Sequence, residues 1–349
     1  MLSLLPASKL ILRHSNRLKS RLVLFAGDLQ DILPAKFTAV NVSVHANQYN
    51  YWKKLSSLMS KNCFFSLSAN NTITVKSNAM IYYWPKSKQE AKFNLYNLFS
   101  FLPIGTELFI VGENHSGVRS AEGMIEHYGS LKKIDSAFHC ALYHGFLKKQ
   151  SNFNLADWWS NYQIGSLSIA TLPGVFSFNK LDIGSKILLS IFQSDIKGKI
   201  LDVGCGAGVL SAVIGKISPR VNLTLIDVSA PALAASQMTL TINSIQGKVI
   251  PSDIYSNVKG CFDIIISNPP FHNSTQISLT NAKKIIYGAP SHLRRGGKLC
   301  IVANSFLPYA QMLDNVFGAH QVLVKTRHFK VYVSYLNGIY SNRNTIFFN

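Results

Sequence analysis

A short corner, Asn268-Pro269-Pro270-Phe271, follows the apolar run FDIII (262–266) after one serine. The side-chain oxygen of Asn268 and the carbonyl of Pro269 could accept the two protons of a planar amine, whose delocalised lone pair would then turn outward. Proline has a fixed φ and no N–H, which holds that carbonyl rigidly, and Phe271 offers a face for a base to stack on. The corner therefore indicates methyl transfer to an amine, accelerated by positioning and oriented dipoles.

A glycine-rich loop, LDVGCGAG (201–208), precedes this corner along the chain. Its glycines, Gly204, Gly206 and Gly208, let the backbone turn sharply, and the next helix begins with free amides. A dinucleotide loop has glycine spacings of two and then three, whereas both spacings here are two. Asp202 before the first glycine would repel a pyrophosphate but suits a cofactor that carries an ammonium and a sulfonium. The loop therefore predicts S-adenosylmethionine as the cofactor.

Acidic residues follow the next two apolar runs at regular places. Asp227, with Val228 beside it, is predicted to take the ribose hydroxyls of the cofactor. Asp253 is predicted to accept the adenine amino group, with Ile254 against the ring. A strand-end aspartate also commonly caps the following helix, but the regular placement beside the glycine loop favours cofactor binding. We expect Asn268 to border the cofactor as well.

Apolar β-rich runs alternate with helical ones from about residue 180 onward, and the chain ends in two β-rich runs around a basic turn. Such alternation predicts a mostly parallel sheet covered on both faces, and the final runs predict a hairpin. We therefore expect an α/β fold of the Rossmann-like methyltransferase type, with a seven-stranded sheet and a terminal antiparallel strand. Ligands bind at the carboxyl ends of the strands in such sheets, so the loop, the acids and the corner should meet there.

A repeat of this plan lies in the first half of the chain. The run FLPIGTELFIVGEN (101–114) matches HLRRGGKLCIVANS (292–305) in its turn, its apolar strand and a terminal Asn. This match aligns Asn114 with Asn304. Self-similarity of this kind predicts an internal duplication and two tandem domains.

Only the later copy keeps the chemical motifs. IYYWP (81–85) lies where the Asn-Pro-Pro corner does, with Trp84 in place of Asn, and Gly27 stands without further glycines. We expect a methyltransferase-like N-terminal domain over 1–160 and a catalytic domain over 161–349.

The composition of the chain indicates which binding partners and which cellular compartment to expect. The 349 residues carry a net charge of +19, spread over both halves, and 47% are hydrophobic. Such a field favours a polyanion such as RNA, although a chain rich in Lys, Asn, Ile and Ser can also be basic through composition alone. Five scattered cysteines without a CxxC pair predict neither a disulfide framework nor a metal site. No run approaches a membrane span or a signal-peptide core, so we expect a cytoplasmic protein.

Longer motifs match one known family: LDVGCGAGVLS (201–211), FDIIISNPPFH (262–272), LPGVFSFNKLDIGSKILLS (172–190) and VGENHSGVRSAEGM (111–124). By these motifs the chain resembles the ribosomal RNA small subunit methyltransferase C family over nearly its whole length. The resemblance implies transfer of a methyl group from S-adenosylmethionine to the exocyclic N2 amine of a guanine in 16S ribosomal RNA. Free RNA and the assembled small subunit both remain open as substrate.

The resemblance also bears on residues outside the motifs of the cofactor loop. It implies a degenerate first domain that no longer binds cofactor and that positions RNA or stabilises the fold. It further implies that the stretch Phe176–Ser185 covers the substrate pocket, with Asp182 and Gly184 as weak candidates in it. His115 stands where a Lys or Arg is expected, which would leave more of any RNA contact to Arg119. We interpret His272 as a pocket wall rather than a base.

Rival functions share parts of this pattern. The same corner could methylate a protein glutamine amide or another base amine. A nicotinamide-dependent oxidoreductase is the third alternative, which the glycine spacing and the lack of a proton-relay pair disfavour.

Overall fold

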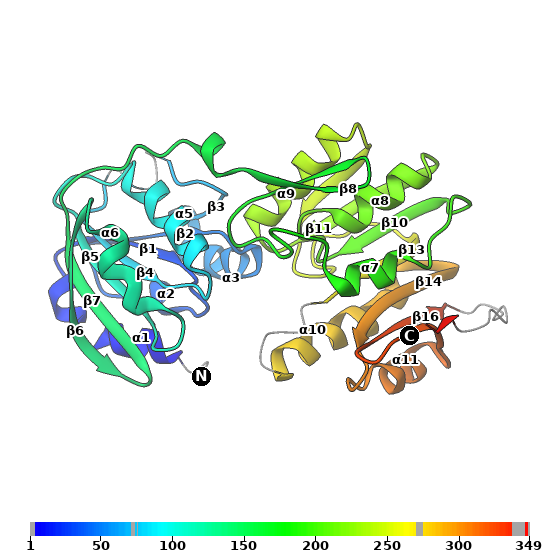
Figure 1. The fold of residues 1–349 in the computed structure, drawn as a ribbon. Coiled ribbons are helices and arrows are strands. Elements are labelled where there is room, and N and C mark those ends of the chain that lie inside the picture. The colour runs from blue at the N-terminus through cyan, green and yellow to red at the C-terminus, as the bar shows by residue number, and fades with distance from the viewer. Residues whose placement is uncertain (1–3, 71–73, 75, 270–274, 337–345, 348–349) are drawn as a thin grey trace. The chain divides into compact units, whose positions relative to one another are not determined.

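The structure is a computed structural model, and it describes residues 4–70, 74, 76–269, 275–336 and 346–347. The chain divides into two compact units, Met1–Trp159 and Ser160–Asn349, and each contains its own α/β sheet (Figure 1). None of the helices within these described ranges is long and apolar enough to cross a membrane.

The sheet of the first unit has seven strands in the order β3-β2-β1-β4-β5-β7-β6. The first five run parallel, whereas β7 is antiparallel to both β5 and β6. In chain order the strands are β1 (Leu22–Gly27), β2 (Asn41–Ala46), β3 (Cys63–Phe65), β4 (Ala79–Tyr83), β5 (Glu107–Glu113), β6 (Gly129–Ala137) and β7 (Cys140–Leu147). The helices are α1 (Pro6–Leu12), α2 (Leu33–Lys36), α3 (Tyr49–Met59), α5 (Lys88–Phe99) and α6 (Ala121–Ile125).

The second unit repeats this order and adds one short strand: β12-β11-β10-β13-β14-β16-β15-β17. Its strands are β10 (Gly198–Val203), β11 (Val221–Asp227), β12 (Gly247–Pro251), β13 (Phe262–Ser267), β14 (Leu293–Asn304), β15 (Gln321–Lys325), β16 (Phe329–Tyr335) and β17 (Ile346–Phe347). The helices are α7 (Ile183–Leu189), α8 (Val209–Ile217), α9 (Ala230–Ile242), α10 (Thr275–Gly288) and α11 (Tyr309–Phe317). The predicted α/β class is confirmed, but this sheet has eight strands instead of seven because β17 pairs in parallel with β15.

A separate two-stranded ribbon, β8 (Ser160–Ile164) and β9 (Leu167–Thr171), begins the second unit. The Thr239 hydroxyl of α9 accepts a hydrogen bond from the Ala170 N–H at 3.0 Å, and Asn243 exchanges two bonds with the backbone of Ser168. These side chains fasten the ribbon to α9.

Alternate residues of each central strand belong to different apolar clusters, because neighbouring side chains on a strand point to opposite faces. In the first unit Leu24 packs with α5 and α6, whereas Val23 packs with α1 and α3. In the second unit Leu201 packs with α10 and α11, whereas Ile200 packs with α7 and α8. Both sheets are therefore covered on two faces, as a parallel sheet requires.

The strand registers of the two sheets can be matched residue by residue. The N–H of Asn114 donates to the His139 carbonyl, and the N–H of Ser305 donates to that of His328, both at 2.8 Å. Glu113 therefore occupies the place of Asn304. The predicted repeat is present, but the sequence alignment of Asn114 with Asn304 is wrong by one residue, since the terminal Asn of each run is not the equivalent one.

The same correction applies at the Asn-Pro-Pro corner. Six residues before the matched pair Glu113 and Asn304, β5 and β14 have Glu107 and Lys298. Glu107 pairs with Ala79 of β4, and Lys298 pairs with Ile264 of β13. Four residues further along β4 and β13, Tyr83 rather than Trp84 then corresponds to Asn268.

Two further strand pairings extend the residue-by-residue match of the two units to the strands that end at the predicted cofactor site. Ala79 pairs with Val23, and Ile264 pairs with Ile200, so Gly27 corresponds to Gly204 and Phe25 to Asp202. Through β2 and β11, Ala46 corresponds to Asp227. An equivalent hydrogen bond supports this assignment, because the N–H groups of Ser66 and Ser252 donate to the carbonyls of Ala46 and Asp227.

Candidate active site

Asp202 lies near the carboxyl end of β10, and its side chain is completely buried. The Ser211 hydroxyl donates to its Oδ2 at 2.7 Å. Its Oδ1 accepts no hydrogen bond from the described residues. Desolvation raises the pKa of this carboxyl to about 7, against the opposing effect of the Ser211 hydrogen bond. A buried acceptor without a partner costs stability, so this oxygen marks a position where a positive charge would be stabilised.

The glycine loop connects β10 to α8 in a left-handed backbone conformation. Gly204, Gly206 and Gly208 all have φ between 54° and 76°, a region that favours glycine. A Cβ on Gly208 would lie 3.1 Å from the Cα of Ser236, so α9 also packs closely there. A Cβ on Gly204 would meet no atom within 4 Å. The loop therefore packs tightly at its end and leaves open space at its start.

Cys205 is a structural residue of this loop. Its thiol is buried 3.1 Å from the Ser236 hydroxyl. Burial raises its pKa well above the ordinary value, which removes the thiolate that a nucleophile requires.

Asp227 at the end of β11 is tied directly to the glycine loop. The N–H of Gly206 donates to its Oδ2 at 3.0 Å, and the N–H of Ser229 donates to its Oδ1 at 2.9 Å. Burial raises the pKa of this carboxyl, and these amide hydrogen bonds oppose the shift. The carboxylate predicted to bind a ribose, with Val228 following it, is thus held rigidly against the loop.

Asp253 and Ile254 follow β12, whose last residue, Pro251, pairs with Asp227. The N–H of Asp253 donates to the Ser256 hydroxyl at 3.1 Å. Ile254 has φ of 52°, which is unusual for a β-branched residue. Such conformations persist only where the surroundings enforce them, and they concentrate at functional sites.

Asn268 follows β13, and its side-chain amide has a defined orientation. Its Nδ2 donates to the Asp182 carboxylate at 2.8 Å and to the Ser185 hydroxyl at 2.9 Å. Its Oδ1 is buried and accepts no hydrogen bond from the described residues. Because both donors of Nδ2 are used, Oδ1 is the part of the amide that remains for a ligand.

The partners of Asn268 come from the start of α7. Asp182 caps this helix, since the Ser185 N–H donates to its Oδ2 at 3.1 Å. A Cβ on Gly184 would lie 3.1 Å from Asn268 Oδ1, so a larger residue would crowd the amide. The sequence indicated Asp182 and Gly184 only weakly and did not single out Ser185, because Asp182 and Asn268 are 86 positions apart and their contact cannot be read from the sequence.

The predicted cofactor and acceptor residues meet at one edge of the sheet. Strand β10 lies between β11 and β13, and the Ser267 hydroxyl donates to the Val203 carbonyl at 2.8 Å. Pro269 is buried behind Asn268. Phe271 and His272 lie outside the described residues, so their predicted roles stay predictions.

Phe176, the first residue of the stretch predicted to cover the substrate pocket, is a further aromatic residue at this edge. Its Cβ would lie 3.9 Å from a Cβ on Gly206, and the residue is 43% exposed. The sequence indicated the stretch but did not single out this side chain.

Metal coordination receives no support from the described part of the chain, where no group of three or more His, Cys, Asp or Glu side chains could hold an ion. The carboxylates at the sheet edge instead bind backbone amides and hydroxyls.

The sheet order, the left-handed glycine loop and the strand-end carboxylates define a Rossmann-like methyltransferase. Residues 166–333 match the family described as Methyltransferase small domain, and residues 8–162 match Methyltransferase small domain N-terminal.

The relatives narrow this class. Ribosomal RNA small subunit methyltransferase C of Yersinia pseudotuberculosis is 56% identical over 332 residues, which are 95% of this chain and 96% of that protein. The Serratia proteamaculans protein of the same name is 54% identical with the same coverage. The chain therefore belongs to the ribosomal RNA small subunit methyltransferase C family, and the nicotinamide alternative is not supported.

A solved structure shares the fold over almost the whole chain. It is the T. thermophilus 16S rRNA N2 G1207 methyltransferase (RsmC) in complex with AdoMet and guanosine. The TM-score is 0.78 at 20% identity, with 95% of this chain and 92% of that chain covered.

Proposed function

We propose that the second unit transfers a methyl group from S-adenosylmethionine to the N2 amine of a guanine in 16S ribosomal RNA, in the cytoplasm. Membership of the ribosomal RNA small subunit methyltransferase C family supports the reaction and the RNA. The solved relative in complex with AdoMet and guanosine supports the cofactor and the base.

The observation that carries the chemistry is the orientation of the Asn268 amide. Nδ2 is bound to Asp182 and Ser185, so the amide group of Asn268 can offer a ligand only the hydrogen-bond acceptor Oδ1. This arrangement selects a ligand that donates an N–H. The Pro269 carbonyl supplies the second acceptor. Together they draw the two amine protons away from the ring plane, which frees the nitrogen lone pair for attack.

The chain offers a suitable environment for a cationic cofactor. S-adenosylmethionine supplies an electrophilic methyl group on a sulfonium. Asp227, held by the Gly206 and Ser229 amides, binds the ribose, and Asp253 and Ile254 hold the adenine. The unpartnered Oδ1 of Asp202 fits a nearby positive charge, because a cation favours the ionised form of a buried carboxyl.

The first unit carries none of these groups at the matched positions. Phe25 and Ala46 replace Asp202 and Asp227, and Leu67 and Tyr83 replace Asp253 and Asn268. We assign residues 1–160 to a degenerate domain and 161–349 to the catalytic domain. The end of the first compact unit at Trp159 supports this boundary.

Replacing Asn268 tests the proposal directly. Asn268→Ala should lower kcat by about 10²- to 10³-fold, the usual effect of losing one oriented polar group at a reacting centre, and should leave cofactor affinity within about twofold. The assay is transfer of labelled methyl groups to small subunits lacking the modification, followed by mass mapping of the methylated guanine. Asn222→Ala removes an exposed asparagine near the start of β11, at the opposite end of the same sheet, and should change kcat by less than about threefold. A kcat of Asn268→Ala within that same range would refute the role of the amide.

A glutamine side-chain amide also offers two N–H groups to Asn268 Oδ1. For this reason a glutamine-containing polypeptide belongs in the same assay. Methylation of the polypeptide without methylation of RNA would reassign the acceptor and keep the chemistry.

A further inference from the structure

A surface cavity of about 590 Å³ lies in the first unit. It is lined by Glu113, Asn114, His115, Arg119, Phe138 and His139, together with the start of α1. We call it the hairpin cavity, because Phe138 and His139 form the turn between β6 and β7.

The turn of this hairpin presents an aromatic ring at an energetic cost. Phe138 and His139 have φ of 56° and 59°, a geometry that two-residue hairpins normally give to Asn-Gly or Gly-Gly. Phe138 as a whole is 49% exposed. A bulky residue held half-exposed in this conformation points to a function for its side chain.

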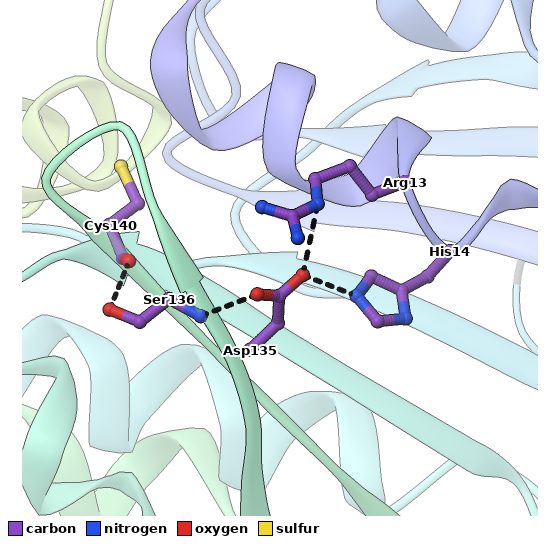
Figure 2. Close-up of polar contacts among 5 residues, drawn as sticks. All are labelled: Arg13, His14, Asp135, Ser136 and Cys140. Atoms are coloured by element: carbon purple, nitrogen blue, oxygen red, sulfur yellow. Dashed lines mark hydrogen bonds and ion pairs between the residues drawn. The ribbon is translucent and has the colours of Figure 1, made fainter.

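Contacts around the turn hold it in place, as Figure 2 shows. The carboxylate of Asp135 lies 2.8 Å from His14 and 3.3 Å from Arg13, which follow α1. It also accepts the N–H of Ser136 at 2.7 Å, and the Ser136 hydroxyl donates to the Cys140 carbonyl at 3.1 Å. These bonds join the hairpin to the α1 region, so the ring is presented from a rigid support.

Among the charged side chains that line the hairpin cavity, Arg119 is available to bind an anionic ligand. Glu113 is paired with His115 at 2.9 Å. Arg119 is exposed and forms no salt bridge with a carboxylate among the described residues. A guanidinium beside an exposed ring matches a nucleotide, whose phosphate binds arginine and whose base stacks on an aromatic face.

The register match places this cavity on the acceptor side of the first sheet. The end of β5 and the β6–β7 turn correspond to the end of β14 and the β15–β16 turn, and β14 is the neighbour of β13, which carries Asn268. The first unit thus lacks the cofactor-side groups but has a cavity at the carboxyl end of β5, next to β4, the strand that corresponds to β13.

We propose that the hairpin cavity binds a second, unmodified nucleotide of the substrate RNA, with its phosphate on Arg119 and its base on Phe138. This inference rests on the proposed function only in taking RNA as the substrate. It assigns the first unit a specific contact in recognition.

The test uses the full-length protein without cofactor and measures binding of its 16S RNA substrate segment by fluorescence anisotropy. Phe138→Gly removes the ring and relieves the left-handed backbone, so it should weaken RNA binding by about tenfold while the melting temperature stays equal or rises. Phe138→Tyr should restore affinity. Phe146→Ala, which removes a similarly exposed phenylalanine of β7, is the matched control and should bind as the wild type does.

Arg119→Gln gives an independent measurement. It should lower the slope of log affinity against log salt by about one unit, whereas Lys149→Gln, an exposed control, should not. Equal affinity of Phe138→Gly and wild type would overturn the inference even if the enzyme still methylates guanine. A loss seen only on assembled subunits and not on naked RNA would also overturn it, in favour of a protein contact. Failure of the wild type to methylate any RNA would instead refute the proposed function.

Discussion

The two units present different side chains at matched positions on one backbone plan. Where β11 ends in Asp227, tied to the glycine loop, β2 ends in the buried Ala46. Where β13 leads to Asn268, with its free amide oxygen, β4 ends in Tyr83, whose hydroxyl lies 2.8 Å from that of Ser8. At these matched strand ends the first unit therefore has a methyl group and a paired hydroxyl, whereas the second has a carboxylate and an amide oxygen without a partner among the described residues. The same sheet therefore supports either role, and a few side chains at the strand ends decide which one.

The difference also has a steric component. A Cβ on Gly27 would lie only 2.1 Å from the Tyr83 carbonyl, whereas one on the matched Gly204 would meet nothing within 4 Å. The backbone of the first unit closes over the position that the second unit keeps open.

Exchanging the strand-end acid should produce the largest effect. Asp227→Ala should weaken S-adenosylmethionine binding by about 10- to 10²-fold, since it removes a charged acceptor worth ~1.5–3 kcal/mol and releases the Gly206 amide. Ala46→Asp places a carboxylate at the matched position of the first unit. It should destabilise the protein by ~1–3 kcal/mol without creating a second cofactor site. Calorimetric titration with cofactor and urea unfolding measure the two effects, and a stoichiometry of two for Ala46→Asp would contradict the comparison.

Replacing Asp182, which orients the Asn268 amide, should have a smaller effect on the enzyme. Asp182→Ala should lower kcat by about tenfold, because the amide can then rotate, and should cost ~1 kcal/mol as a lost helix cap. Asp182→Asn keeps an oxygen that can accept from Nδ2 and should recover most of kcat. If both variants lost activity in proportion to stability alone, the orienting role of Asp182 would be wrong. Steady-state kinetics together with thermal unfolding distinguish these cases.

The pH dependence of stability should show the smallest effect. The pKa of Asp202 is raised to about 7 by desolvation, so the folded state binds a proton that the unfolded state releases near its ordinary value. Stability is then greatest below about pH 4 for this group and falls as the pH rises toward 7, by at most about 1.4 kcal/mol per pH unit. Asp202→Asn should flatten this slope in the cofactor-free protein.

Glu90 in the first unit is the matched control for that measurement. Desolvation, with a contribution from Asp28, raises its pKa to about 7 as well. Glu90→Gln should also reduce the slope, though less because the residue is only partly buried. Only Asp202→Asn should alter cofactor affinity. Unchanged slopes in both variants between pH 5 and 8 would show that neither carboxyl titrates there.

Local signals predicted much of the second unit. The glycine loop, the strand-end acids and the Asn-Pro-Pro corner lie beside the strands that position them, so their place on the sheet followed from strand–helix alternation. Ser185 and Phe176 were predicted only as the two ends of a stretch over the substrate pocket, because their own contacts are with residues distant in sequence. The offset of one residue at Trp84 arose because letter matching aligns similar side chains, whereas the ladder hydrogen bonds define the equivalent backbone positions.

By itself, the amino-acid sequence determined the class of fold, the chemistry at the end of β13 and the family, since each depends on residue types at short spacings. Tertiary structure decided which atoms remain available. It left Asn268 Oδ1 without a partner among the described residues by binding Nδ2 to Asp182 and Ser185. Burial raised the pKa of Asp202, and the contacts of Asp135 joined the β6–β7 hairpin to the α1 region beside the hairpin cavity. Those outcomes depend on burial and on contacts between distant segments, which exist only after the strands have paired.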